Sequence, residues 1–254
     1  MNENEIKKAV REQYSQVVEQ SEQSCCSTES CCCGDDPQAA AILAGYTQEE
    51  LAQIPQESVL GLGCGNPAAF AGLKPGETVL DLGSGAGIDV FLASIKVGRT
   101  GKAIGVDMTP QMVKKANTLA KDKGYQNVEF RLGEIENLPV ADNSVNTIMS
   151  NCVINLSPDK SRVFSEAYRV LKTGGKMVVS DIVSEKELPL TMQADMNAWS
   201  SCISGALPKE EYLAKITEAG FATREIISER EFFVEVGEGK EMQRMFSVTV
   251  KAEK

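Results

Sequence analysis

The chain has 254 residues, of which 42% are hydrophobic and 24% are charged. This length is enough for one large domain with a sizeable core, so its stability requires neither disulfides nor a structural metal. The formal charge of −10 disfavours general binding to nucleic-acid phosphates. No apolar run is long enough to span a membrane, and the charged start, MNENEIKKAV, is not typical of a secretory signal. We therefore expect a cytoplasmic protein.

Two segments of different character precede the main domain. Residues 4–20 place apolar side chains at helical spacing, which predicts an amphipathic helix. Residues 21–37, SEQSCCSTESCCCGDDP, are small, polar and rich in cysteine, which is typical of a mobile segment outside a core. Residues 47–54 favour one or two helical turns. We expect residues 1–56 to form this helix and the mobile cysteine-rich segment, and residues 57–254 to form the main domain.

Strands and helices alternate from residue 78 onward. Apolar runs predict five strands, at 78–83, 102–108, 127–133, 145–154 and 176–183. Helical patterns occupy 87–97, 109–124, 158–172, 188–200 and 208–219, with Gly124 and the Gly174-Gly175 pair expected at helix ends. Two last strands, 222–235 and 243–252, suggest an antiparallel pair at one edge. The alternation predicts an α/β, Rossmann-like fold with a mostly parallel seven-stranded sheet and helices on both faces.

A glycine-rich loop, DLGSGAG, follows the first strand at residues 81–87. Its G-x-G-x-G spacing is tighter than the dinucleotide fingerprint, and no Lys-Ser or Lys-Thr follows it, so it is not a phosphate loop. Asp81 places a carboxylate before the glycines, which suits a cationic ligand group. Asp107 ends the second strand, where a carboxylate can accept hydrogen bonds from both hydroxyls of a ribose. The alternative is a tight turn beside a solvated acid.

This loop resembles motif I of the class I S-adenosylmethionine-dependent methyltransferases, and the resemblance covers about residues 75–183. By that resemblance Asp81 faces the methionine end of the cofactor, Asp107 holds the ribose and Met108 flanks the adenine. Glu134 would accept a hydrogen bond from the adenine amino group, with an exposed loop acid as the alternative, and Asn151 would lie near the methyl sulfonium. The resemblance thus implies these cofactor-binding residues: Asp81, Gly83, Ser84, Gly85, Asp107, Met108, Glu134, Ile135 and Asn151.

The chain has eight cysteines and no histidine. Cys64, Cys152 and Cys202 stand apart in GLGCGNP, SNCVINLSPDK and WSSCISGAL, and five more crowd residues 25–33. A chain without histidine cannot run a Ser-His-Asp or Cys-His mechanism. A disulfide framework is not expected in a long cytosolic chain. A Cys₄ zinc site stays open as an alternative, although the crowded cysteines lack paired C-x₂-C spacing; buried, inert cysteines are another.

Thiolates select soft, thiophilic ions. Arsenite exchanges its hydroxyls for thiolates and keeps a lone pair, which can attack a sulfonium methyl without a general base. The product is formally As(V), and two thiols could return two electrons by forming a disulfide. Abundant cysteine, absent histidine and a sulfonium-cofactor fold fit this chemistry together.

Four stretches resemble the small prokaryotic arsenite methyltransferases: ESVLGLGCGNP, KPGETVLDLGSGAGIDV, SNCVINLSPDK and DMNAWSSCISGAL, between residues 57 and 207. The resemblance implies that Cys152 and Cys202 bind As(III), with Cys64 as a third functional cysteine. A fourth would come from the cysteine-rich segment, where Cys33 and Cys32 are favoured. Arsenite and methylarsenite are the implied substrates, and glutathione or thioredoxin the implied reductant. We expect a monomer and, after one turnover without reductant, a disulfide between Cys64 and one of Cys31, Cys32 and Cys33.

Some members carry an additional C-terminal domain, which we expect this chain to lack, so mono-, di- and trimethylated products all stay open. Two other functions also stay open. One is methylation of another small acceptor, such as a quinone or a lipid. The other is a metalloid- or zinc-sequestering protein that no longer catalyses, although sequestration alone needs no cofactor loop.

Overall fold

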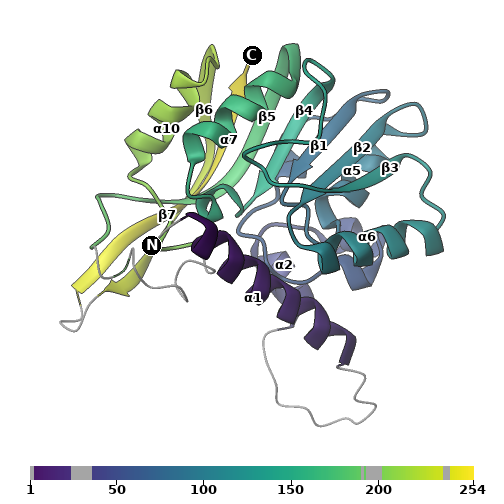
Figure 1. Ribbon diagram of the computed structural model, residues 1–254, viewed down its shortest axis with the longest axis horizontal. Helices are drawn as coiled ribbons and strands as arrows, with labels where there is room; N and C mark the ends of the chain where they lie inside the picture. The colour runs from purple at the N-terminus through teal and green to yellow at the C-terminus, as the bar shows by residue number, and fades with distance from the viewer. Residues whose placement is uncertain (1–2, 24–35, 190–191, 193–201, 237–240) are drawn as a thin grey trace.

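The computed structural model describes residues 3–23, 36–189, 192, 202–236 and 241–254 (Figure 1). A seven-stranded sheet in the order β3-β2-β1-β4-β5-β7-β6 forms its centre. The strands are β1 (Thr78–Leu82), β2 (Lys102–Asp107), β3 (Val128–Leu132), β4 (Val145–Asn151), β5 (Leu171–Ser184), β6 (Thr223–Val236) and β7 (Glu241–Glu253).

Strands β1 to β5 pair in parallel, and β7 pairs antiparallel with both β5 and β6. The predicted strands are therefore confirmed, including the antiparallel pair at one edge. Parallel strands need helical crossovers, which bury both faces of the sheet and explain the near-continuous apolar runs at these positions. The sheet is mixed rather than purely parallel, because the last two strands form a hairpin.

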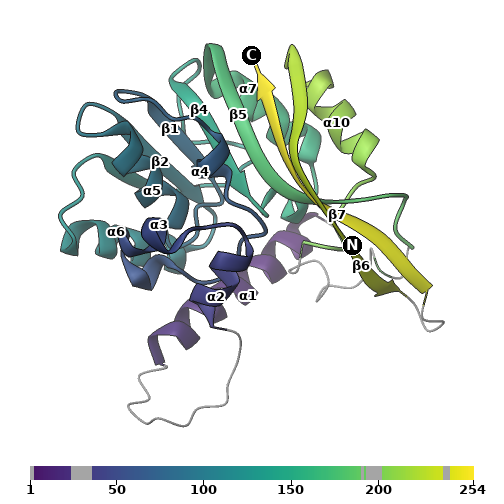
Figure 2. The same ribbon diagram turned by 180° about the vertical axis from the view of Figure 1, so that it is seen from behind.

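Helices cover both faces of this sheet (Figures 1 and 2). On one face α7 (Lys160–Val170) and α10 (Lys209–Glu218) pack through Phe164 and Tyr212, whose rings meet edge to face at 5.4 Å. On the other face lie α4 (Pro67–Phe70), α5 (Ile88–Val97) and α6 (Pro110–Asp122), with Phe91 at the centre of that core. Each face thus has its own apolar core, as the alternation of strands and helices predicts.

Three sequence-based boundaries are wrong. The Gly174-Gly175 pair lies inside β5 and not at a helix end, because Leu171 already pairs with Val145 and Gly174 donates to the carbonyl of Lys254 at 2.9 Å. The helix predicted to residue 172 accordingly ends at Val170. The strand predicted to residue 154 ends at Asn151, and the 3₁₀ turn η2 (Ile154–Leu156) follows it. Most of the helix predicted at 188–200 lies outside the described residues.

The N-terminal elements are α1 (Glu3–Gln23), α2 (Pro37–Leu43), α3 (Gln48–Ala52) and the 3₁₀ turn η1 (Gln56–Ser58). The amphipathic helix is longer than predicted and runs across one end of the sheet (Figures 1 and 2). Its buried Ile6 and Val10 join an apolar cluster beside the sheet, and Val18 contacts a second one. None of the helices in the described ranges is long and apolar enough to cross a membrane.

Candidate active site

The glycine loop, the ends of β2 and β4, and α1 together surround one pocket, which we call the glycine-loop pocket. It lies at the carboxyl ends of the parallel strands, where open α/β sheets bind ligands. Its lining includes eight of the nine predicted cofactor-binding residues: Asp81, Gly83, Ser84, Gly85, Asp107, Met108, Ile135 and Asn151. The structure therefore brings residues from four separate segments of the chain to one place.

Gly83 shows why this loop needs glycine. Its φ is +65°, a left-handed conformation that favours glycine. A Cβ built there would also clash with the side chain of Val153. The backbone therefore passes close to the chain after β4, and the pocket stays open beside it.

Three carboxylates face this pocket: the buried Asp81 and Asp89 and the half-buried Asp107. Burial and the neighbouring charges of Asp89 and Asp107 raise the pKa of Asp81 well above its usual range, and no described residue donates a hydrogen bond to its carboxylate. Burial raises the pKa of Asp89 to about 6, against the lowering effect of hydrogen bonds from Tyr46 and Asn151. Clustered acids without a full set of cationic partners favour a cationic ligand.

Asp107 lies at the end of β2, as predicted. Its two carboxylate oxygens accept hydrogen bonds from the amides of Gly85 at 2.9 Å and Thr109 at 2.8 Å. These bonds orient the carboxylate and leave further lone pairs toward the pocket. Binding of a ribose by Asp107 stays a prediction.

Glu134 is the predicted cofactor residue that does not line the pocket. Its carboxylate pairs with Lys7 at 2.8 Å and Arg11 at 3.5 Å, both on α1. Lys7 also pairs with Glu136 at 3.1 Å. These ion pairs fasten α1 to the loop after β3, and a contact between Glu134 and an adenine stays a prediction.

Asn151 lines the pocket, but its side-chain amide is engaged by protein groups. The oxygen accepts hydrogen bonds from the backbone amides of Cys64 at 3.0 Å and Gly65 at 3.2 Å. The nitrogen donates to the carbonyl of Gly65 at 2.7 Å and to the hydroxyl of Tyr46 at 2.9 Å. Asn151 therefore joins the pocket to the turn that carries Cys64.

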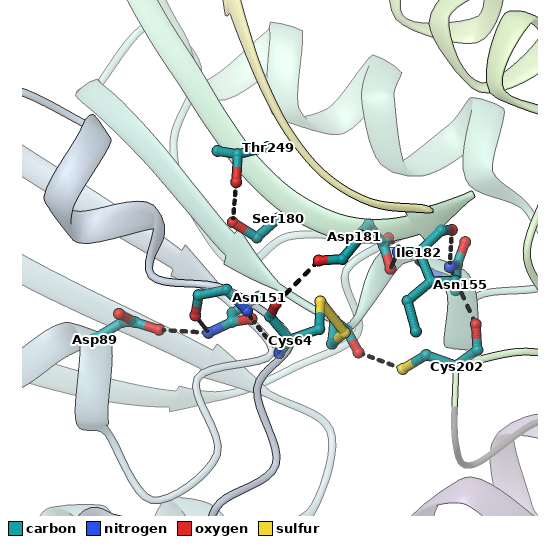
Figure 3. The surroundings of a disulfide bond; sticks show 12 residues. Cys64, Asp89, Asn151, Asn155, Ser180, Asp181, Ile182, Cys202 and Thr249 are labelled. Atoms are coloured by element: carbon teal, nitrogen blue, oxygen red, sulfur yellow. Dashed lines mark hydrogen bonds between the residues drawn. A yellow bond between two sulfur atoms is a disulfide. The ribbon is translucent and has the colours of Figure 1, made fainter. Parts of the chain in front are cut away.

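The structure brings Cys64, Cys152 and Cys202 together beside the pocket (Figure 3). Cys64 and Cys152 form a disulfide with a Cα–Cα distance of 5.8 Å. The thiol of Cys202 donates to the carbonyl of Cys152 at 2.8 Å. Joint binding of arsenic by these three cysteines first requires reduction of the disulfide, because Cys64 and Cys152 are bonded to each other.

The observed disulfide joins Cys64 to Cys152, and the pairing of Cys64 with the cysteine-rich segment after turnover stays a prediction. Two residues separated by 88 positions meet because β4 ends against the turn that contains Cys64. Cys25, Cys26, Cys31, Cys32 and Cys33 lie outside the described residues. A role for Cys32 or Cys33 therefore stays a prediction.

The backbones of Cys152 and Cys202 are both left-handed, with φ of 54° and 61°. This conformation costs a residue with a Cβ roughly 1–2 kcal/mol. The amide of Cys152 donates to the carbonyl of Ser180 at 2.8 Å, and Asn155 donates to the carbonyl of Cys202 at 3.2 Å. Local strain held by such bonds is characteristic of functional sites.

The buried carboxyl group of Asp181 affects Cys202 through its charge. Asp181 accepts hydrogen bonds from the amides of Asn155 and Ile182 and from the hydroxyl of Tyr212. Burial raises the pKa of the Cys202 thiol well above its usual range, and the charge of Asp181 raises it further. The thiol of Cys202 is therefore neutral near pH 7 in the absence of a ligand.

Tyr14, Tyr46 and Asp89 also line the pocket, and none of them was predicted as a site residue from the sequence. Asp89 did carry a signal, because it is a lone acid in the apolar helix start IDVFLAS. Tyr14 could be predicted as a pocket residue only if the packing of α1 were known, because its ring lies among apolar residues near the cysteines and Met108. Tyr46 belongs to a loop whose sequence shows no periodic pattern.

The pocket chemistry fits S-adenosylmethionine. Its sulfonium and ammonium charges suit the carboxylates of Asp81 and Asp89. The buried carboxylate of Asp81, which has no cationic partner in the part of the chain that the structure describes, would gain an ion pair. Apolar Met108 and Ile135 line the same pocket. The fold and this site define the class I S-adenosylmethionine-dependent methyltransferase fold.

Comparison with known proteins agrees with a methyltransferase and indicates a particular family of methyltransferases. Residues 73–223 match the family model described as "Methyltransferase domain". An arsenite methyltransferase of Halobacterium salinarum is 52% identical over 182 residues, which are 72% of this chain and 46% of that protein. The human arsenite methyltransferase is 37% identical over 176 residues, 66% of this chain and 46% of that protein. The chain thus spans about half the length of these curated relatives.

A solved structure provides the fuller match. The arsenic(III) S-adenosylmethionine methyltransferase CrArsM of Chlamydomonas reinhardtii superimposes with a TM-score of 0.68 at 36% identity. The match covers 87% of this chain and 75% of that one. The chain belongs to the arsenite methyltransferase family.

Proposed function

We propose that this chain transfers a methyl group from S-adenosylmethionine to trivalent arsenic, giving methylated arsenicals and S-adenosylhomocysteine in arsenic detoxification. The observation that carries the proposal is the placement of Cys64, Cys152 and Cys202 beside a pocket lined by buried acids. The family membership supports the same conclusion.

The residues of the pocket have distinct tasks in this proposal. Asp81 and Asp89 hold the cationic methionine end, Asp107 accepts hydrogen bonds from the ribose, and Met108 and Ile135 contact the adenine. When bound, the cofactor supplies a methyl group on a positively charged sulfur, which is an electrophile. Helix α1 covers the pocket and excludes water, because Val10 and Tyr14 form part of its lining.

The thiols bind arsenite by exchange. Each As–S bond replaces an As–O bond, and the thiol proton leaves with the displaced hydroxide as water. A neutral Cys202 thiol therefore brings the proton that the leaving group needs. Bound at Cys152 and Cys202, with Cys64 as a third ligand for arsenite, the arsenic keeps a lone pair for the methyl group, and no side chain has to act as a base.

Reduction completes the proposed cycle. Transfer of the methyl group leaves arsenic formally as As(V), and oxidation of two thiols to a disulfide returns it to As(III). Cys64 and Cys152 are close enough for such a bond, and the cysteine-rich segment with Cys32 and Cys33 is the second candidate source of a thiol. Glutathione or thioredoxin would then restore the thiols. We place this activity in a monomer in the reducing cytoplasm.

The proposal is tested by incubating the reduced protein with S-adenosylmethionine and arsenite, then separating the arsenic species by chromatography with mass-spectrometric detection. Methylated arsenic and S-adenosylhomocysteine should appear together and should depend on added thiol. A demethylated quinone offered in place of arsenite serves as the control acceptor. Cofactor turnover with the quinone and none with arsenite would contradict the proposal.

A further inference from the structure

Two routes of hydrogen bonds join the backbone of Cys64 to Asp89, and both pass through Asn151. In the direct route, drawn in Figure 3, the Asn151 nitrogen donates to an Asp89 oxygen at 3.4 Å; the other route includes Tyr46. The Cys64 amide donates to the Asn151 oxygen at 3.0 Å, and the Asn151 nitrogen donates to the Tyr46 hydroxyl at 2.9 Å. The Tyr46 hydroxyl donates to both oxygens of Asp89, at 3.0 and 2.9 Å. All donors point the same way, toward the carboxylate, so each bond polarises the next one.

The side chains at the Asp89 end of these hydrogen bonds are buried. Asp89 and Tyr46 are 2% and 3% exposed, so water does not compete for their polar atoms. Burial and the charge of Asp89 raise the pKa of the Tyr46 hydroxyl well above its usual range, which keeps the phenol as a donor. In a buried network the hydrogen bonds are stronger, and an unpaired member is costly.

The turn around Cys64 is closely fitted to Asn151. A Cβ built on Gly63 would lie 2.5 Å from the Asn151 side-chain nitrogen, and one on Gly65 would lie 2.6 Å from Cβ of Ser180. The carbonyl of Cys64 accepts a hydrogen bond from the hydroxyl of Ser247 at 3.0 Å. The hydrogen bonds of the Cys64 amide with Asn151 and of the Cys64 carbonyl with Ser247 fix the position of the Cys64 backbone. A shift of Asn151 would therefore move Cys64.

We propose that Tyr46 and Asp89 are positioning residues for Cys64, acting through Asn151, and that a cation bound in the glycine-loop pocket alters the reactivity of Cys64 by this route. A cation beside Asp89 neutralises part of the negative charge of its carboxylate. The hydrogen bonds that Tyr46 and Asn151 make toward that carboxylate then become weaker. Cys64 itself does not line the pocket, so this effect has to pass through the protein. The inference rests on the proposed function only in taking S-adenosylhomocysteine, with its ammonium group, as the probe.

The test measures how fast iodoacetamide alkylates Cys64 in the fully reduced protein, with and without saturating S-adenosylhomocysteine, by mass spectrometry of the Cys64 peptide. In the wild type the probe should change the rate by at least about fivefold, the lower end of typical coupling between sites. In Tyr46→Phe, which keeps the ring and removes the hydroxyl, the change should become smaller, because Asn151 then contacts Asp89 only through its longer hydrogen bond at 3.4 Å. In Asp89→Asn, which keeps the shape and removes the charge, the change should fall below about twofold.

Tyr125→Phe is the matched control, because among the described residues its hydroxyl donates only to the carbonyl of Gln53, at 3.4 Å, away from the pocket. It should behave as the wild type. Calorimetry confirms saturation in each variant, and circular dichroism confirms folding; should Tyr46→Phe fail to fold, Asp89→Asn decides. If S-adenosylhomocysteine changes the alkylation rate of Cys64 in both variants as much as in the wild type, the ligand shields Cys64 directly, and the proposal is overturned. Probe binding without any effect in the wild type would also overturn it, whereas absence of probe binding would instead contradict the proposed function.

Discussion

Acidification should weaken binding of the cofactor through the buried acids of the glycine-loop pocket. Asp89 has a pKa of about 6, because burial and the charge of Glu50 raise it against hydrogen bonds from Tyr46 and Asn151 and the charge of Lys96. Burial raises the pKa of Asp81 as well, together with the charges of Asp89 and Asp107. A cationic ligand favours the ionised forms, so protons must leave before or during binding.

The magnitude follows from the fraction of ionised Asp89. With a pKa of about 6, the carboxylate is roughly 90% ionised at pH 7 and roughly 10% ionised at pH 5. The dissociation constant of S-adenosylhomocysteine should therefore rise about tenfold from pH 7 to pH 5, which is about 1.4 kcal/mol of binding free energy. Titration of Asp81 adds to this change with the same sign.

Isothermal titration calorimetry at pH 5 to 8 measures this dependence, and buffers of different ionisation enthalpy report the protons released. Asp89→Asn mimics the protonated acid, so at pH 7 it should lose the about tenfold in affinity assigned to Asp89 and bind no more weakly than the wild type does at pH 5. An affinity that stays constant or increases between pH 7 and pH 5, in protein that circular dichroism shows to be folded, would refute the assignment of a cationic ligand to these acids.

Three further predictions concern the ribose site, the arsenic site and the glycine loop. Asp107→Ala should weaken cofactor binding by about tenfold to a hundredfold, since lost hydrogen bonds to a charged acceptor cost about 1.5–3 kcal/mol; unchanged affinity by calorimetry would reject the ribose assignment. Cys202→Ser should abolish arsenite methylation and keep cofactor affinity within about twofold, and a variant methylating at the native rate would reject the thiol site. Gly83→Ala should lower the free energy of unfolding by more than Gly124→Ala, measured by urea denaturation. Both glycines have a positive φ, +65° and +74°, which costs alanine about 1 kcal/mol, but only the Gly83 position adds a clash with Val153.

The order of strands and helices could be predicted because local patterns determine it. The apolar runs at 78–82 and 102–107 form buried parallel strands, and the glycines between strand and helix mark the turn at the pocket. Asp81 and Asp107 could be placed at the same sheet edge, since the carboxyl ends of parallel strands meet there. The Gly174-Gly175 pair misled the prediction, because glycine also allows the bend at the start of a strand that pairs with the C-terminus.

The rest of the site depends on contacts between distant segments. The packing of α1 over the pocket, through Lys7 and the acids after β3, brings together residues 127 positions apart. The Cys64–Cys152 bond and the Tyr46–Asp89 contact likewise join separate loops. No periodicity or spacing encodes such pairs, so composition could indicate thiol chemistry but not which thiols meet.

A single-turnover experiment tests the central claim most directly. Fully reduced protein, freed of added reductant, is mixed with one equivalent of arsenite and excess methyl-labelled S-adenosylmethionine, and both the arsenic species and the cysteine peptides are analysed. We expect label on arsenic at about one methyl group per chain, an equal amount of S-adenosylhomocysteine, and one new disulfide that includes Cys64 or Cys152. Bound cofactor with no label on arsenic, in protein whose Cys152 and Cys202 are reduced, would contradict the central claim.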